Sequence, residues 1–233
     1  MPETLQEFHA RVDGFQQDSL PHAGGLTTKP LLVEKVAPDG TLLPFFGNTM
    51  IFDLPMDAKI AVARMQLLLH HRCAGMLAEP LTPAALHMTL HDLLNGVDEA
   101  ALAEPVRQTG TQAKAILADI RAARLPALHL TSTLAFNMTG GSVTLGFAPD
   151  TEDDCALLMA LHARYQAVVA LDYPLTPHVT LAYFRPGWHI PEMVAALADT
   201  LARINALPKV HITLTADELH YCRFADMNTY LRE

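Results

Sequence analysis

The chain has 233 residues, a hydrophobic fraction of 50% and a formal net charge of −9 at pH 7. This length and composition predict one globular domain, or two small lobes, around a substantial core. The negative charge argues against long nucleic acid as a partner, because a basic face is what holds a phosphate backbone. The negative net charge is compatible with a small phosphate ligand bound in a local pocket.

The sequence carries no signal for export, membrane insertion or disulfide bonding. Its first residues, MPETLQEFHARVDGF, are partly acidic and contain no apolar signal-peptide core, and no apolar run approaches 18 residues. Cys73, Cys155 and Cys222 are scattered and form no Cys-x-x-Cys pair, which favours neither a disulfide framework nor a zinc site. We therefore expect a soluble protein of the reducing cytoplasm that contacts no membrane.

Residues 1–46 precede the regular pattern and form an N-terminal extension, which we expect to pack against the rest or to cover part of a cleft. Two similar series of elements follow. The first contains a strand-like run, a helical segment, a His-x-Thr strand, a helical segment and a second His-x-Thr strand, at 48–54, 55–77, 86–93, 113–125 and 125–133. The second contains the same five elements at 142–148, 151–171, 177–184, 191–204 and 207–215, with Thr151 as the expected cap of its first helix.

The two series predict an internal duplication of a β-α-β-α-β unit. The expected fold class is α+β, with lobes at about 47–136 and 141–224 that form one domain over 47–233. Antiparallel sheets of the two lobes would face a central cleft about a pseudo-two-fold axis.

The first and third His-x-Thr copies are the main candidates for a site. Both follow Leu-Thr-Pro, and they lie ninety-one residues apart. Because side chains alternate along a strand, His87 and Thr89 share one face, as do His178 and Thr180. If the lobes face each other, these four side chains converge on one cleft.

The other two copies place His129 and His211 on strands of their own. The same alternation applies to them, so they stay possible cleft residues. Their flanking residues give weaker support for a position in the cleft. The alternative is that they are ordinary strand histidines without a functional role.

The segments LTPAALHMTLHDL and LTPHVTLAYF resemble the two signature motifs of the two-histidine (2H) phosphoesterase superfamily, which includes 2′-5′ RNA ligase-like proteins and cyclic nucleotide phosphodiesterases. The resemblance spans about residues 45–225, and LPFFGNTMIFDL looks like a bacterial and fungal branch. It implies that His87, Thr89, His178 and Thr180 are catalytic.

The implied activity is metal-independent hydrolysis of a cyclic or 2′-5′ phosphodiester of a small nucleotide or short RNA, with no cofactor. One imidazole would act as base and the other as acid, and the sequence leaves their assignment open. The same site run in reverse would be an RNA end ligase. A non-catalytic phosphonucleotide-binding protein and a histidine-based metallohydrolase are the alternatives.

Four further residues are candidates for substrate binding: Tyr183, Arg185, Trp188 and Asn48. Tyr183 lies five positions after His178, so it reaches the same face only if a bulge intervenes. Arg185 is placed to neutralise a second phosphate or to be solvated. Trp188 suits a nucleobase or a surface contact, and Asn48 suits the cleft or a turn.

A metal site at His87 and His91 is not expected. Their separation of four residues suits paired ligands on a helix, whereas on a strand it places them about 13 Å apart. His70 and His71 fall in a helical segment, where adjacent side chains point in different directions.

Overall fold

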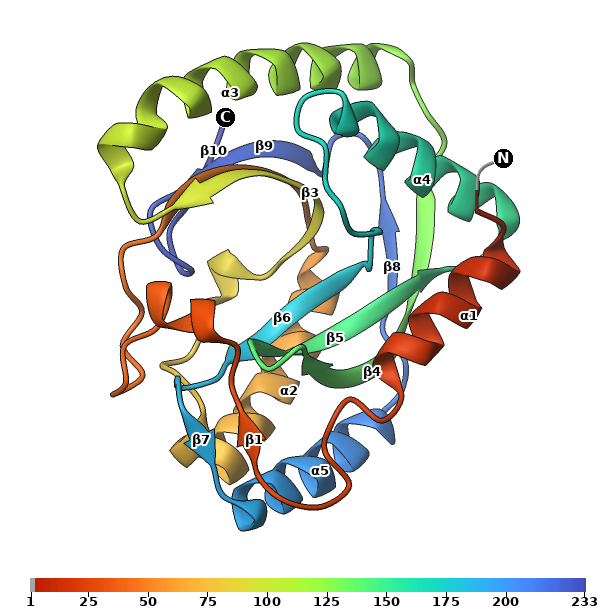
Figure 1. The fold of residues 1–233 in the computed structure, drawn as a ribbon. Coiled ribbons are helices and arrows are strands. Elements are labelled where there is room, and N and C mark those ends of the chain that lie inside the picture. The colour runs from red at the N-terminus through yellow and green to blue at the C-terminus, as the bar shows by residue number, and fades with distance from the viewer. Residues whose placement is uncertain (1–2) are drawn as a thin grey trace.

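The computed structural model describes residues 3–233 and contains two four-stranded antiparallel sheets with helices on their outer faces (Figure 1). The first sheet has the strand order β10-β9-β2-β3, and the second has the order β6-β5-β4-β8. The strands of the first sheet are β2 (Phe46–Asp53), β3 (His87–Gly96), β9 (Leu219–Phe224) and β10 (Tyr230–Arg232). Those of the second are β4 (Leu128–Met138), β5 (Ser142–Pro149), β6 (His178–Tyr183) and β8 (His211–Leu214).

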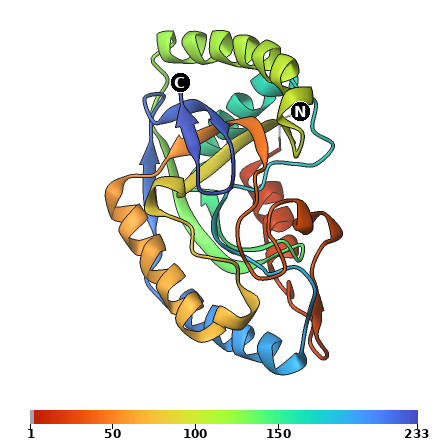
Figure 2. The same ribbon diagram turned by 90° about the vertical axis from the view of Figure 1, so that its left-hand side faces the viewer.

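Four helices cover the outer faces of the two sheets. Helix α3 (Glu99–Ala122) packs on β2, β3 and β9, and α4 (Glu152–Gln166) contacts β3 as well as β4 and β5. Helices α2 (Met56–Cys73) and α5 (Pro191–Asn205) pack on each other and back the second sheet. Figures 1 and 2 show α3 above the first sheet and the α2–α5 pair below the second, so the two sheets face each other in the middle.

The helix boundaries follow local capping chemistry. Thr151 caps α4, because its side-chain oxygen accepts a hydrogen bond from the backbone N–H of Asp154 at 3.1 Å. Pro191 occupies the first turn of α5, where its missing N–H costs nothing. Helix α3 begins after Asp98, fourteen residues before the predicted segment, and contains Pro105 within its first turns. The predicted helical segment therefore captured only its second half.

The predicted fold class, α+β with antiparallel sheets, is confirmed, but the sheets do not follow the two contiguous series. Strand β4, expected in the first lobe, pairs with β5 and β8 of the second sheet. Strand β9 returns from the C-terminal end to pair with β2. The strands of His129 and His211 are consequently neighbours in one sheet rather than counterparts in two lobes.

The N-terminal segment, residues 3–45, lies against both sheets. It contains helix α1 (Leu5–Gln16), the short strand β1 (Leu26–Thr27) and a 3₁₀ helix at Pro30–Glu34. Helix α1 packs on β4, β5 and α4, and β1 pairs with β7 (Trp188–His189) in a two-stranded sheet. Within residues 3–233, no helix combines the length and apolar character needed to cross a bilayer.

Candidate functional site

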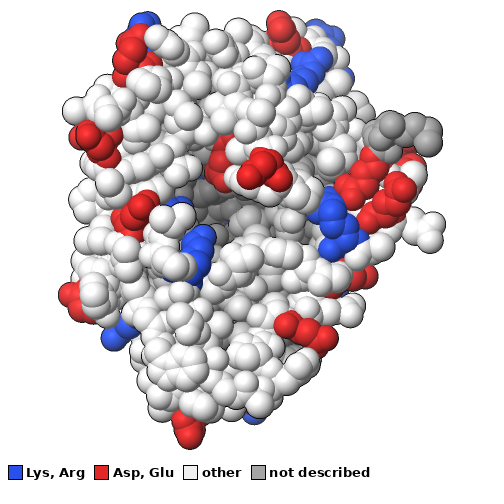
Figure 3. Space-filling view, viewed as in Figure 1, with Lys and Arg blue, Asp and Glu red and all other residues white. Residues whose placement is uncertain are grey.

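A cavity of about 660 Å³ lies between the two sheets and opens on the face seen in Figure 3. Its walls come from β3, β5 and β6, from the loop before β6, from the C-terminal strands and from the N-terminal segment. Volumes of this order accommodate a nucleotide-sized ligand. Figure 3 shows Lys and Arg side chains on the lower and right-hand rim of the hollow and acidic side chains above it.

The structure brings the two main motifs together in this cavity. His87 and Thr89 lie on β3, the edge strand of the first sheet, and His178 and Thr180 lie on β6, the edge strand of the second. All four side chains line the cavity. The apolar residues between them, Met88 and its counterpart in β6, are buried in the core behind. The alternation predicted from the sequence therefore presents one imidazole and one hydroxyl from each sheet.

Both imidazoles are fixed by the same backbone contact. His87 Nδ1 lies 2.7 Å from the carbonyl oxygen of Ala85, and His178 Nδ1 lies 2.7 Å from that of Thr176. A carbonyl oxygen only accepts hydrogen bonds, so Nδ1 carries a proton in each ring. In the neutral tautomer, Nε2 is then the nitrogen with the free lone pair, and it is available to the cavity.

Burial makes both imidazoles weak bases. It lowers the pKa of His87 to about 4, although the Ala85 carbonyl opposes the shift, and the charges of Arg232 and His178 lower it further. Burial also lowers the pKa of His178, where the Thr176 carbonyl and the Asp92 charge act in the opposite direction. The two histidines thus face one cavity in different electrostatic surroundings.

A β-bulge in each motif strand brings a third side chain to the cavity. In β6, Val143 of the neighbouring strand pairs with Ala182 and the next residue pairs with Thr180, so Leu181 is an extra residue. Tyr183 can share the strand face of His178 only if a bulge lies between them. This bulge is present, and Tyr183 lines the cavity. Its hydroxyl donates to the sulfur of Met227 at 3.1 Å.

Strand β3 repeats the arrangement five residues after His87. Met50 pairs with His91 and Ile51 with Thr89, which leaves Leu90 as the extra residue and turns Asp92 into the cavity. The Asp92 carboxylate accepts a hydrogen bond from the Tyr173 hydroxyl at 3.0 Å. Asp92 and Tyr183 are therefore equivalent positions of the two motifs, which an alignment of the two segments by their histidines identifies from sequence.

The charged lining of the cavity is mainly basic. Arg11, Lys29 and Lys35 line it, and Asp92 is the one carboxylate among the described lining residues. Arg11 is neutralised by Glu3, with contacts of 2.7 and 2.8 Å. The cavity of this acidic chain therefore presents two lysines against one carboxylate, which favours an anionic ligand.

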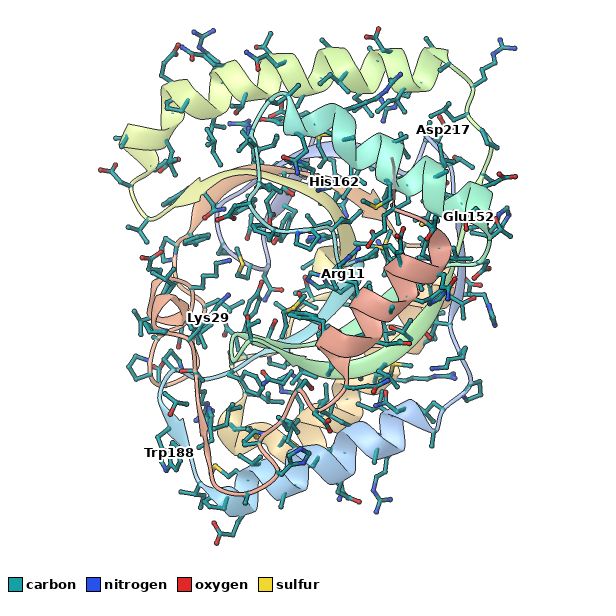
Figure 4. The ribbon with its side chains drawn as sticks, turned by 45° about the vertical axis from the view of Figure 1, so that its right-hand side comes forward. Arg11, Lys29, Glu152, His162, Trp188 and Asp217 are labelled. Carbon is teal, nitrogen blue, oxygen red and sulfur yellow. The ribbon has the colours of Figure 1, made fainter. Side chains whose placement is uncertain are left out.

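Two predicted binding residues lie elsewhere. Arg185 donates from Nε to the carbonyl oxygen of Leu77 at 2.8 Å and is outside the cavity lining. Trp188 pairs with the N-terminal segment in β7 and is 60% exposed; Figure 4 shows it far from Arg11, Lys29 and His162, which gather around the cavity. The aromatic residues that do line the cavity are Phe15, Phe45, Tyr173, Tyr183, Phe224 and Tyr230.

Asn48 points away from the cavity, toward α3. Its neighbour Thr49 pairs with Asp92 and takes the cavity face of β2, which leaves Asn48 on the opposite face. The Asn48 amide is buried, donates to the Tyr221 hydroxyl and to groups of α3, and accepts from the N–H of Leu94 at 3.0 Å. Asn48 therefore lies outside the cavity lining, in a buried hydrogen-bond network that joins β2 to its neighbours.

His129 and His211 do not line the cavity in the described part of the chain, although the pairing register places them on the same face of the second sheet as His178. Both are exposed. His211 Nδ1 contacts the Thr131 hydroxyl at 2.8 Å, and His129 Nδ1 lies 3.3 Å from the Asp154 carboxylate. They lie away from the cavity because β4 and β8 are the strands farthest from β6, and helix α1 packs on β4 and β5 between them and the cavity histidines.

A second histidine pair, His91 and His162, also belongs to the cavity wall. The rings of His91 and His162 have centroids 4.9 Å apart, and both residues are buried. Burial, followed by the charge of His91, lowers the pKa of His162 to about 4. Over residues 3–233 no group of three or more His, Cys, Asp or Glu side chains is arranged to hold a metal ion.

Several solved structures resemble the chain. The crystal structure of ATU0111, a conserved protein of unknown function from Agrobacterium tumefaciens, is 19% identical in sequence, covers 96% of this chain and 97% of its own, and gives a TM-score of 0.66. E. coli LigT complexed with 3′-AMP is 14% identical over 81% of this chain and 95% of its own, with a TM-score of 0.48. TT0787 of Thermus thermophilus is 17% identical over 79% and 93%, with a TM-score of 0.45. The sequence matches no protein-family model and no curated protein.

The likeness to ATU0111 extends over nearly the whole of both chains, so it includes most of the N-terminal segment as well as the two sheets. The chain therefore has the fold of ATU0111.

Proposed function

We propose that the protein is a 2H phosphoesterase that hydrolyses a cyclic or 2′-5′ phosphodiester of a nucleotide or short oligonucleotide without a metal ion. One observation carries the proposal: two His/Thr pairs from opposite sheets, His87 with Thr89 and His178 with Thr180, line one cavity, and each imidazole is held by the carbonyl two residues before it. The basic lining of the cavity supports an anionic substrate.

Hydrolysis of a cyclic phosphodiester needs a base and an acid at once. A water oxygen forms a bond to phosphorus while the bond to the ribose oxygen breaks. One Nε2 takes the proton of the attacking water, and the protonated Nε2 of the other histidine gives its proton to the departing oxygen. Each such transfer typically contributes about 10²- to 10⁴-fold in rate. Thr89 and Thr180 would donate to the non-bridging oxygens, where charge is concentrated.

The surroundings of the two imidazoles favour His87 as the base. Its pKa of about 4 keeps it unprotonated in weakly acidic solution. At His178 the negative charge of Asp92 is the largest charge effect and stabilises the protonated form, so this residue is the better acid. A bound phosphodiester anion favours the imidazolium further.

The test is turnover in the presence of EDTA over a panel of 2′,3′-cyclic nucleotides, ADP-ribose 1″,2″-cyclic phosphate and 2′-5′ oligoadenylates. We expect the wild-type protein to hydrolyse at least one of them. His87→Gln and His178→Gln should each lower kcat by at least about 10²-fold, because each removes one proton transfer.

His211→Gln is the matched control, since His211 belongs to the same His-x-Thr pattern but lies outside the cavity. It should leave kcat unchanged. Activity that disappears with EDTA, or that survives both cavity substitutions, would contradict the mechanism. Binding of the panel without turnover would identify the cavity as a recognition site.

A further inference from the structure

Lys29 and Lys35 are the two lysines that line the cavity, and both come from the N-terminal segment. Neither forms an ion pair with a carboxylate of residues 3–233. The three other lysines each contact an oxygen away from the cavity: Lys59 that of Asp53, Lys114 that of Glu233 and Lys209 that of Thr133. Lys29 and Lys35, which line the cavity, are therefore also the two lysines whose ammonium groups contact no carboxylate or carbonyl oxygen of residues 3–233.

The fold holds Lys29 in place against the β4–β5 hairpin. Its backbone N–H donates to the carbonyl oxygen of Gly140 at 3.1 Å, directly after the β1–β7 pairing. Its side chain runs so close to Gly141 that a Cβ built there would come within 2.9 Å of Nζ. A glycine at that position therefore leaves space for the lysine, and Figure 4 shows Lys29 at the cavity.

Lys35 is held by the 3₁₀ helix and by an aromatic ring. Its backbone N–H donates to the carbonyl oxygen of Leu32, and its ammonium lies 4.6 Å from the centroid of the Phe45 ring. Burial lowers the pKa of Lys35 and the charge of Lys29 lowers it further, while the more weakly acting charges of Asp92 and Glu34 oppose the shift. Two ammonium groups within range of each other and without a carboxylate partner are electrostatically unfavourable, and a bound dianion would relieve this repulsion.

We propose that Lys29 and Lys35 bind a phosphate monoester that the substrate carries in addition to the phosphodiester at the histidines. The proposal rests on the proposed function and specifies its substrate class, a 5′-phosphorylated ribose 2′,3′-cyclic phosphate. A phosphate monoester carries nearly two negative charges at neutral pH, which matches two ammonium groups. On a ribose with a 2′,3′-cyclic phosphate, the 5′ oxygen is the remaining position for such a group. Arg185, considered for a second phosphate from the sequence, lies outside the cavity.

The experiment compares adenosine 2′,3′-cyclic phosphate with and without a 5′-phosphate. Binding is measured by calorimetry and turnover as kcat/KM, on wild type, on Lys29→Met, Lys35→Met and their double variant, and on Lys114→Met. Lys114 is the matched control, because it carries the same charge but lies on the exposed face of α3. A charge-assisted hydrogen bond to phosphate is worth about ten- to a hundredfold in affinity.

We expect the wild type to prefer the 5′-phosphorylated compound by at least about a hundredfold, about tenfold for each lysine. Each cavity substitution should reduce this preference about tenfold or more, to near unity in the double variant, while Lys114→Met leaves it unchanged. Equal affinity of the wild type for the two compounds, or an undiminished preference in both cavity variants, would overturn the proposal. A wild type that binds the 5′-phosphorylated compound preferentially but hydrolyses neither it nor any compound of the panel above would leave the lysine site standing and refute the phosphoesterase activity.

Discussion

His87 and His178 are held by the same bond, from Nδ1 to the carbonyl oxygen two residues earlier, at 2.7 Å in both cases. The two contacts orient the free Nε2 of each ring from opposite sheets. Their electrostatic surroundings nevertheless differ, since Arg232 is the largest charge effect on the pKa of His87 and Asp92 is the largest on that of His178. Catalysis by one base and one acid requires this combination: both rings are oriented in the same way, but the charges around them favour the neutral form of one and the protonated form of the other.

The first prediction concerns the pH dependence of kcat/KM, which reports the pKa values of the free protein. A base works unprotonated, so activity should rise as the pH increases through about 4, where His87 loses its proton. An acid works protonated, so activity should fall as the pH increases through the pKa of His178, which burial holds below 6.5. We expect a bell-shaped profile with its maximum between these values. A plateau that extends into the alkaline range would show that no imidazolium takes part.

Asp92→Asn should shift that profile to lower pH, because the Asp92 charge raises the pKa of both histidines. Burial lowers the pKa of His178, and the Asp92 charge partly offsets the shift, so the amide should move the alkaline limb to lower pH. Asp150→Asn is the matched control, because Asp150 accepts from the Thr131 hydroxyl at 2.6 Å, is exposed and does not line the cavity. Profiles of both variants would be recorded with the same substrate. An alkaline limb that stays in place in Asp92→Asn would exclude Asp92 as an influence on the acid.

Thr89→Val and Thr180→Val should each lower kcat/KM by about 10- to 100-fold. Valine keeps the shape of threonine and removes the hydroxyl that would donate to a charged phosphate oxygen, an interaction worth about 1.5–3 kcal/mol. Thr131→Val, in one of the two other His-x-Thr copies, should leave kcat/KM unchanged. The steady-state kinetics of the three variants would be compared at the optimal pH. Equal effects of all three substitutions would mean that the loss arises from the fold.

Much of the site followed from local sequence. The alternation of a strand was enough to place His87 beside Thr89, and the capping preference of threonine was enough to start α4 at Thr151. These features depend on residues within one or two turns or pleats of each other. They can therefore be predicted without knowledge of the tertiary structure.

The remainder depended on contacts between distant segments. Asp92 reaches the cavity because of a bulge in the pairing of β3 with β2, and the register of a strand pair is fixed by packing rather than by one strand alone. Lys29 reaches it because β1 pairs with β7, more than 150 residues later. The orientation of Asn48 depends on the same kind of contact, since only the pairing partners determine which face of β2 turns to α3.

Asn48→Ala should destabilise the fold and spare the chemistry. The substitution leaves the Leu94 N–H and the Tyr221 hydroxyl without their amide partner in a buried position. Such losses cost about 2–4 kcal/mol in the free energy of unfolding. Urea denaturation measures this, and kcat/KM at a temperature where the variant is folded should stay within about twofold of wild type. If the variant is as stable as the wild type but less active, Asn48 contributes to substrate binding.

Arg232→Met should lower stability in a pH-dependent way. Arg232 donates from Nε to the Asp53 carboxylate at 2.6 Å and also contacts the carbonyl of Ala84, just before the turn that holds His87. Both partners of the ion pair are about three-quarters buried, at 28% and 24% exposure. Removing the guanidinium should cost about 1–3 kcal/mol at neutral pH, measured by urea unfolding. Arg203→Met, in an exposed pair with Asp199, should cost less than about 1 kcal/mol.

The sign of the pH effect follows from Asp53. Burial raises the pKa of this carboxyl, but the Arg232 bond and charge outweigh it, and the pKa in the folded protein lies below 3.8. A lowered pKa contributes stability that is present above the unfolded value and is lost as the pH falls through the folded value. The difference in unfolding free energy between wild type and Arg232→Met should therefore be largest near neutral pH and shrink below 3.8. If the difference in unfolding free energy between wild type and Arg232→Met is the same above and below pH 3.8, Arg232 stabilises the fold through its packing instead of through Asp53.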